Sequence, residues 1–183
     1  MTSAIVRTRK STRLPEYDYG QTGAYFLTIC TYQRECLFGE IADGEMRLNA
    51  CGNVVVEEWL RSSGVRVEIE LDAFVVMPNH VHAIVIMHND VGATGRSPLG
   101  AARRPGGPAK RSLGAFIAGF KSSVTSRINQ LRSTQGARIW QRNYYEHVVR
   151  SPAEHDRIRR YIADNPRAWP DDEENPANAF GSR

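Results

Sequence analysis

The chain of 183 residues lacks the marks of exported, membrane-spanning and ATP-hydrolysing proteins. No apolar run approaches the roughly 18 residues of a membrane-spanning helix, and residues 1–13 hold no apolar segment of signal-peptide length. No G-x-x-x-x-G-K-[ST] motif is present, so nothing in the sequence indicates the use of ATP. We therefore expect a cytoplasmic protein without a membrane partner.

The chain also has few cysteines and a small net charge. The three cysteines, Cys30, Cys36 and Cys51, are odd in number and lack the spacing of a zinc site, so we expect reduced thiols. A net charge of +4 is compatible with nucleic-acid binding but is weak evidence for it. Hydrophobic residues make up 41% and charged residues 24%, which is ordinary for a soluble globular protein.

Composition divides the chain into segments. Residues 1–22 are polar and predict an N-terminal arm, and residues 23–170 hold the periodic segments of a single domain. Within it, residues 89–111 are rich in glycine, proline and arginine and predict a flexible basic loop, either a spacer or a DNA contact. Residues 171–183 are polar, and we expect a loosely held C-terminal tail.

Hydrophobic periodicity predicts an α+β fold with helices covering one face of a mostly antiparallel sheet. Asn49 and Ser151 suit helix N-caps, Asp43-Gly44 suits a hairpin turn, and Gly64 and Asn165-Pro166 suit helix ends. The predicted strands are 24–32, 65–77, 80–87 and 138–149 (the last as one strand or two), the hairpin is 37–49, and the helices are 49–62, 112–132 and 153–164.

His80 and His82 are two residues apart on a predicted strand. Side chains at this spacing point to the same face, so the two imidazoles form half of a metal site. An ordinary pair of hydrogen-bonded histidines fits the same pattern.

Tyr161 and Asn165 are four residues apart and share one face near the end of the last predicted helix. A tyrosine hydroxyl is a possible covalent nucleophile, and an amide oxygen suits a hard cation such as magnesium. Tyr161 also lies beside Ile158 and Ile162, so a tyrosine packed in the core is the alternative.

Three segments together resemble a known family. Met77-Pro78-Asn79-His80-Val81-His82 is similar to the histidine–hydrophobic–histidine motif of HUH endonucleases. The segment 140–150 (WQRNYYEHVVR) and the pair Tyr161-Ile162 with Asn165-Pro166 resemble REP-associated tyrosine transposases, which belong to the single-tyrosine HUH transposases with the insertion-sequence enzymes. The resemblance covers roughly residues 15–170.

The resemblance implies a ferredoxin-like, RRM-like sheet and a role for each matched residue. His80, His82 and Asn165 would hold Mg²⁺ or Mn²⁺, and Tyr161 would be the single nucleophile. The implied activity is cleavage and rejoining of single-stranded DNA, flanked by a REP-like hairpin, through a 5′-phosphotyrosine. Asparagine at position 165, where insertion-sequence relatives carry glutamine, favours the REP-associated branch.

The expected partner is single-stranded DNA or a DNA hairpin, bound by a bacterial, nucleoid-associated monomer or homodimer. Cationic side chains would contact phosphate and aromatic ones would stack on unpaired bases, although solvated faces and cross-strand packing are the rival interpretations. The candidates are Lys121, Arg127, Arg142, Tyr144, Tyr145 and Arg150.

Two other functions remain open at this stage. A non-catalytic, RRM-like module for single-stranded nucleic acid fits the basic loop and the aromatic segment equally well, but it leaves both spaced pairs unexplained. A metal-dependent phosphodiester hydrolase using water would need a further ligand, for which His88, Asp72 and Glu146 are available.

Overall fold

A computed structural model describes residues 22–88 and 111–180 of the chain. The predicted arm (1–22) and the predicted basic loop (89–111) lie outside these ranges, except for the last residue of each. Within the described ranges, no helix combines the length and the apolar character needed to cross a bilayer.

One four-stranded antiparallel sheet organises the molecule. Its strands are β1 (Gly23–Cys30), β4 (Ile69–Val76), β5 (His80–Met87) and β6 (Tyr145–Val149), in the spatial order β4-β5-β1-β6. Helix α1 (Ala50–Val65) connects the first part of the chain to β4, and α2 (Leu113–Arg132) precedes β6. This order is that of a ferredoxin-like domain, which confirms the predicted α+β fold.

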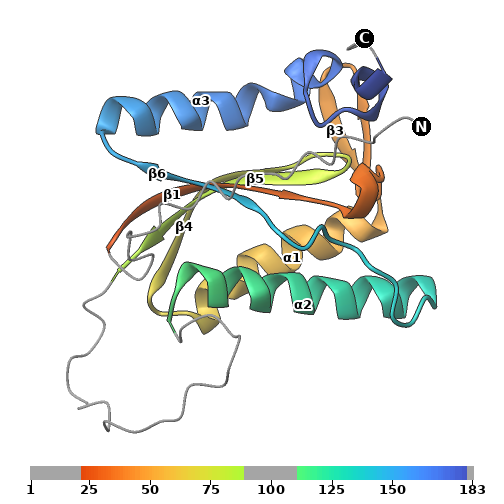
Figure 1. Ribbon diagram of the computed structural model, residues 1–183, viewed down its shortest axis with the longest axis horizontal. Coiled ribbons are helices and arrows are strands. Elements are labelled where there is room, and N and C mark those ends of the chain that lie inside the picture. Colours follow the sequence, from red (N-terminus) through yellow and green to blue (C-terminus); the bar gives the residue numbers. More distant parts are fainter. Residues whose placement is uncertain (1–21, 89–110, 181–183) are drawn as a thin grey trace, which may run out of the picture.

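The sheet is covered on both faces (Figure 1). Helices α1 and α2 pack on one face, where they enclose the main core, and α3 (Pro152–Ala168) lies across the other. A smaller apolar cluster of Ile84, Ile158 and Ile162 joins α3 to the sheet. The prediction that helices cover a single face was therefore wrong, because β5 carries apolar side chains on both faces and each face must be shielded from water.

Helix ends follow the predicted caps only in part. The side chains of Asn49 and Ser151 accept backbone N–H groups at the starts of α1 and α3, as expected. However, α1 continues through Gly64 to Val65, and α3 continues through Pro166 to Ala168. The last turn of α3 therefore includes Pro166, which lacks a backbone donor, and the buried Asn165 before it.

Two further predicted segments are adjusted. The hairpin of β2 (Gly39–Ala42) and β3 (Glu45–Leu48) is confirmed, with φ of 56° at Asp43 and 74° at Gly44, as its tight turn requires. The strand expected at 138–149 is mostly an extended connection: only β6 pairs along its length, and Trp140 makes an isolated bridge with Thr31.

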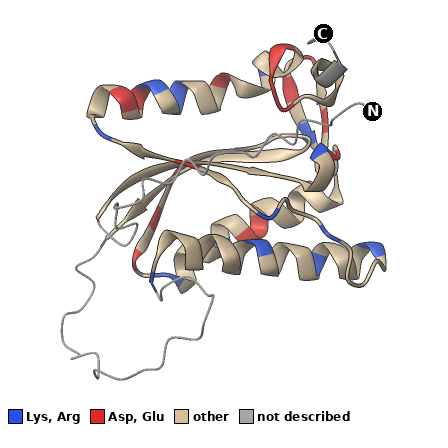
Figure 2. Cartoon of the chain, in the orientation of Figure 1, with Lys and Arg blue, Asp and Glu red and all other residues tan. Residues whose placement is uncertain are grey.

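The segment after α3 folds back against the sheet. It contains the short 3₁₀ helices η2 (Trp169–Asp171) and η3 (Pro176–Phe180). The backbone oxygen of Glu174 accepts a 2.7 Å hydrogen bond from the buried Asn79, and its carboxylate lies 2.8 Å from Arg34. The expected loosely held tail was therefore wrong here, because buried polar contacts anchor it. Figure 2 shows acidic residues gathered in this segment and basic residues recurring along α2.

Candidate active site

The two histidines lie at the start of β5, on the face that α3 covers. His80 is fully buried, His82 is 3% exposed, and their ring centroids are 4.4 Å apart. The alternation of β5 sends Val81, Ala83 and Val85 into the main core and both imidazoles to the opposite face. The two histidines therefore lie on the same face of β5, as their spacing predicts.

Asn79 fixes the protonation of His80. Its amide N–H₂ donates to the backbone oxygens of Arg34 (3.1 Å) and Glu174 (2.7 Å), so its Oδ1 is the atom that lies 2.8 Å from Nδ1 of His80. An amide oxygen only accepts, so Nδ1 of His80 carries the proton. Its Nε2 therefore holds a lone pair, and this atom is buried without a hydrogen-bond partner among the described residues.

Thr28 plays the matching part for His82. It pairs with His82 in the β1–β5 register, and its hydroxyl lies 2.9 Å from Nδ1 of that ring. Burial lowers the pKa of His80 to about 4, and burial followed by the charge of His80 lowers the pKa of His82 to about 3. Both rings are therefore neutral near pH 7, which is the form that binds metal ions.

Tyr161 comes from α3 and meets the histidines directly. Its hydroxyl lies 3.2 Å from Nε2 of His82, and its ring packs edge-on against Phe26 at 6.0 Å. The residue is 47% exposed, so a substrate can reach the phenol. Burial of the hydroxyl, followed by the negative charge of Asp172, raises the pKa of Tyr161, so the phenol keeps its proton.

Asn165 lies one helical turn after Tyr161 and points into the site. The residue is 2% exposed, and within the part of the chain that the structure describes its Oδ1 is buried without a hydrogen-bond partner. Burial is the main influence on the pKa values of His80 and Tyr161, and the Asn165 amide opposes it through its contacts with both residues, raising the pKa of His80 and lowering that of Tyr161. The predicted pair of Tyr161 and Asn165 is thus brought to the predicted pair of histidines.

Sequence reasoning missed Asp172, which follows η2. Its carboxylate and one nitrogen each from His80 and His82 lie within 4.8 Å of one another, and its side chain is 7% exposed. The available signal was the acidic run of residues 171–174 directly after the last helix. That run was assigned to a solvated tail, because polar segments carry no periodicity that reveals packing.

The donor set fits a divalent cation. Nε2 of His80 and Oδ1 of Asn165 are buried polar atoms without partners, and such atoms are costly unless a ligand satisfies them. Asp172 adds a carboxylate that offsets part of the cation's charge. Imidazole nitrogens with amide and carboxylate oxygens are ligands that first-row divalent ions and Mg²⁺ accept.

The predicted DNA contacts divide between the two faces. Lys121 and Arg127 belong to α2, on the face away from α3, so the structure does not bring them to the histidines. Arg127 instead forms ion pairs with Glu57 (2.6 Å) and Glu58 (2.9 Å) of α1. Both acids come from a different helix, so the sequence pattern around Arg127 could not reveal these ion pairs.

The four remaining candidates lie on or beside β6. Tyr145 is 44% exposed and pairs with Thr28 in the β1–β6 register, so it lies on the face of the histidines. Tyr144 packs against the main core, which favours its interpretation as a packing residue. Arg142 and Arg150 are exposed at the two ends of this stretch.

The further ligands considered for a water-using hydrolase lie elsewhere. His88 pairs with Glu70 at 2.8 Å, Asp72 pairs with His155 and Arg159 of α3, and Glu146 is buried in β6. Across the described ranges, none of the three joins the group formed by His80 and His82.

Comparison with known proteins agrees with this architecture. No protein-family model matches the chain. A Haemophilus influenzae protein described as uncharacterized is 36% identical over 173 residues, which span 93% of this chain and 95% of that protein. The solved structure of a REP-associated tyrosine transposase bound to a REP hairpin aligns with a TM-score of 0.56 and 18% identity, covering 86% of this chain and 73% of that one. The chain therefore belongs to the family of the Haemophilus influenzae protein, and its fold is the transposase-like fold of the hairpin-binding enzyme.

Proposed function

We propose that this protein cleaves and rejoins single-stranded DNA, with Tyr161 as the nucleophile. The observation that carries the proposal is the 3.2 Å approach of the Tyr161 hydroxyl to Nε2 of His82. These residues are 79 positions apart in the chain, yet they meet beside Nε2 of His80 and Oδ1 of Asn165, two buried atoms without hydrogen-bond partners among the described residues. Packing alone gives no reason to hold a half-exposed phenol there.

The proposed step forms one phosphoester bond and breaks another. Oη of Tyr161 attacks phosphorus and loses its proton, while the bond from phosphorus to the 3′-oxygen breaks and that oxygen leaves as a 3′-hydroxyl. A 5′-phosphotyrosine results, and attack by a 3′-hydroxyl reverses the step without ATP. The DNA end thus stays activated while it is attached to the protein.

The residues of the site divide the work. His80, His82 and either Asn165 or Asp172 would hold Mg²⁺ or Mn²⁺, which when bound polarises a phosphoryl oxygen and offsets charge in the transition state. Phe26 and His82 fix the ring and hydroxyl of Tyr161. Since burial and the acidic segment raise the pKa of Tyr161, its deprotonation depends on a positive charge nearby.

The proposed partner is a DNA hairpin with a single-stranded flank. Its support is the fold, which this chain shares with a transposase solved in complex with a REP hairpin. The exposed ring of Tyr145, beside Phe26 on the face of the site, suits stacking on an unpaired base. Arg150 would contact phosphate beside it.

The test is a trapped covalent adduct. Purified protein is incubated with a labelled hairpin that carries a single-stranded flank, with Mg²⁺ or Mn²⁺ or with EDTA, and the products are separated under denaturing conditions. We expect a protein–DNA adduct that requires the metal. Tyr161→Phe removes only the nucleophilic oxygen and abolishes the adduct, whereas Tyr145→Phe, the matched change at another exposed tyrosine, retains it.

The other outcomes separate the rival functions. An adduct with Tyr161→Phe means that a different residue attacks phosphorus. Metal-dependent cleavage without any adduct favours the hydrolase that uses water. Binding without cleavage favours the non-catalytic module. His80→Ala combined with His82→Ala should lose cleavage while the protein still unfolds cooperatively on heating.

A further inference from the structure

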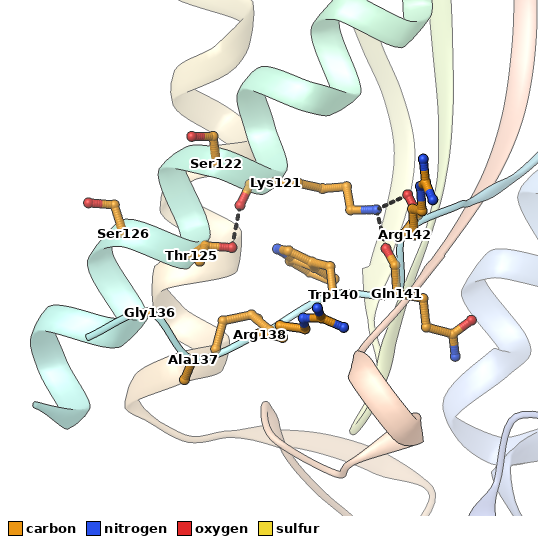
Figure 3. Close-up of a pocket in the computed structure, with 11 residues that line it drawn as sticks. Lys121, Ser122, Thr125, Ser126, Gly136, Ala137, Arg138, Trp140, Gln141 and Arg142 are labelled. Atoms are coloured by element: carbon orange, nitrogen blue, oxygen red, sulfur yellow. Dashed lines mark hydrogen bonds between the residues drawn. The ribbon is translucent and has the colours of Figure 1, made fainter. Parts of the chain in front are cut away.

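On the side of the sheet away from Tyr161, a groove of about 530 Å³ separates α2 from the extended connection at residues 136–142 (Figure 3). The connection passes the end of β1, where Trp140 bridges Thr31 and the Gln141 N–H donates to the oxygen of Cys30 at 3.0 Å. The lining of the groove includes the side chains of Lys121, Ser122, Ser126, Arg138, Trp140 and Arg142.

Among the described residues, those that line the groove include three cations and no acid. Arg138 and Arg142 are exposed, and neither has a carboxylate partner within residues 22–88 and 111–180. By contrast, Arg127 and Arg132 on the same helix α2 are both ion-paired with acidic residues. The guanidinium of Arg138 lies 5.7 Å from the ring centroid of Tyr32, which supports its position and leaves its N–H groups for an acceptor. The groove thus presents uncompensated positive charge.

Lys121 holds the floor of the groove in place. Its ammonium donates to the backbone oxygens of Gln141 and Arg142, the latter at 3.3 Å, and these contacts tie α2 to the connection (Figure 3). An ammonium has three donors, so one remains after these two contacts. Burial lowers the pKa of Lys121 to about 8, and an anion bound beside it would raise this pKa again.

The shape of the groove favours a chain-like anion over a compact one. Ser122 and Ser126 are exposed four residues apart on α2, about 6 Å along its axis, and both belong to the groove wall. Trp140 lies between these hydroxyls and the connection and is itself buried, so it contributes to the shape of the groove. Cations and hydroxyls repeated along a line are the usual contacts of a nucleic-acid backbone.

The groove is connected to the proposed catalytic site through β1. Cys30, which accepts the hydrogen bond from Gln141, pairs with His80 in the β1–β5 register. The groove therefore begins at the end of the sheet that holds the histidines, on the other face. A strand leaving the site round this end of the sheet would enter it.

We propose that this groove binds the phosphodiester backbone of the single-stranded DNA flank beyond the scissile phosphate. The inference rests on the proposed function, since it assigns a path to the same substrate. It adds a second anchoring surface, which would set how many unpaired nucleotides the substrate must have.

The test compares two doubly substituted proteins of equal charge, each in a Tyr161→Phe background that prevents covalent capture. Arg138→Gln with Arg142→Gln changes the groove, and Arg47→Gln with Arg61→Gln changes exposed arginines of β3 and α1 that are already ion-paired. Binding of a fluorescein-labelled hairpin, with and without a single-stranded flank, is measured by anisotropy at several salt concentrations. Thermal unfolding verifies that both proteins fold.

We expect the groove variant to lose roughly tenfold in affinity for the flanked hairpin, with a salt slope smaller by about 1.4 for two lost phosphate contacts. Its affinity for the hairpin without a flank should not change, and the control should match the parent protein. Equal losses on both DNAs, or none, would overturn the inference. A change in sedimentation in place of DNA affinity would also overturn it, because the groove would then contact a second copy of the chain.

The inference and the proposed function fail separately. If unsubstituted protein forms the Tyr161 adduct while the groove variant keeps its affinity for the flank, the groove assignment is wrong and the catalytic one stands. If no adduct forms but the flank-specific loss is seen, the groove is a nucleic-acid surface on a protein that does not cleave.

Discussion

The chemistry of a buried histidine depends on what its second nitrogen touches. For His82 that contact is the hydroxyl of Thr28, at 2.9 Å from Nδ1 on the neighbouring strand. For His80 it is the Oδ1 of Asn79, whose orientation is fixed by two further hydrogen bonds. Each partner orients the ring that would meet a cation, and Asn79, whose oxygen can only accept, also selects the tautomer of His80.

Replacing Thr28 with valine tests this dependence, because valine keeps the shape and removes the hydroxyl. We expect Thr28→Val to weaken divalent-metal binding by about 10- to 100-fold, since the ring of His82 loses its orienting partner. Thr28→Ser retains the hydroxyl and should stay close to the parent protein. Titration calorimetry with Mn²⁺ measures both, and equal affinities for the two variants would contradict the argument.

Single residues also show what the sequence could reveal about the site. The spacing of His80 and His82 sufficed to place both on one face, because a strand alternates with a period of two. Tyr161 and Asn165 were paired by the helical repeat for the same reason. Asp172 was not identified as a ligand, because it lies in an irregular segment whose position depends on the tertiary contacts of Asn79 and Arg34 with Glu174.

Among the structural elements, α3 is positioned by an irregularity in β4. The register with β5 shifts between Leu71 and Phe74, and in this interval Asp72 contacts α3. Its carboxylate accepts hydrogen bonds from Arg159 and lies 2.7 Å from His155. The bulge thus joins the edge of the sheet to the helix that carries Tyr161.

This junction should make stability depend on pH. Burial alone would raise the pKa of Asp72, but hydrogen bonds and charges from Arg159 and His155 outweigh it and lower the pKa. A lowered folded-state pKa contributes stability above the ordinary carboxyl range, near pH 4, and loses it as the pH falls through the lowered value. We expect Asp72→Asn to lower Tm by a few degrees at pH 7.

Calorimetry at several pH values checks this expectation, because the difference in Tm between Asp72→Asn and the parent should shrink below about pH 4. Glu70→Gln on the same strand is the matched control, since among the described residues its carboxylate pairs with the exposed His88 and not with α3. A difference that stays constant down to pH 2 would mean that the ion pair is not its cause.

The elements themselves were predicted where periodicity is strong and missed where it is not. The bounds of β5 agree with the prediction, and those of α2 differ by one residue, because their apolar patterns are long and regular. The two-sided cover of the sheet was missed, although Ile84 and Ile86 already gave β5 a second apolar face. The connection at 138–144 contains strand-forming residues, but within the described ranges its pairing is limited to the bridge of Trp140 with Thr31, and β6 begins at Tyr145.

At the scale of the whole molecule, the proposed cation would tie together regions that are distant in sequence. The donors come from β5, from the end of α3 and from the segment after η2. Binding of a ligand to the folded state alone stabilises it by about 2.7 kcal/mol at 100 times Kd. For a chain of this size, that corresponds to a Tm increase of about 5–10 °C.

We therefore expect Mn²⁺ to raise Tm by this amount and EDTA to reverse the effect, as measured by scanning calorimetry. His80→Ala with His82→Ala should show no increase. Substituting Asn165→Ala and Asp172→Asn separately shows which oxygen serves as the third ligand, because that change reduces the increase more than the other. An increase that persists without both histidines would place the cation elsewhere.

The contact between Tyr161 and His82 lies within a single polypeptide. If each copy forms its own catalytic centre, two inactive variants cannot complement each other. A mixture of Tyr161→Phe with the variant carrying His80→Ala and His82→Ala would then be inactive at every ratio. For the intact protein, turnover per molecule would be indifferent to dilution. Rescue in the mixture would instead mean that the helix bearing the phenol crosses to a neighbouring copy.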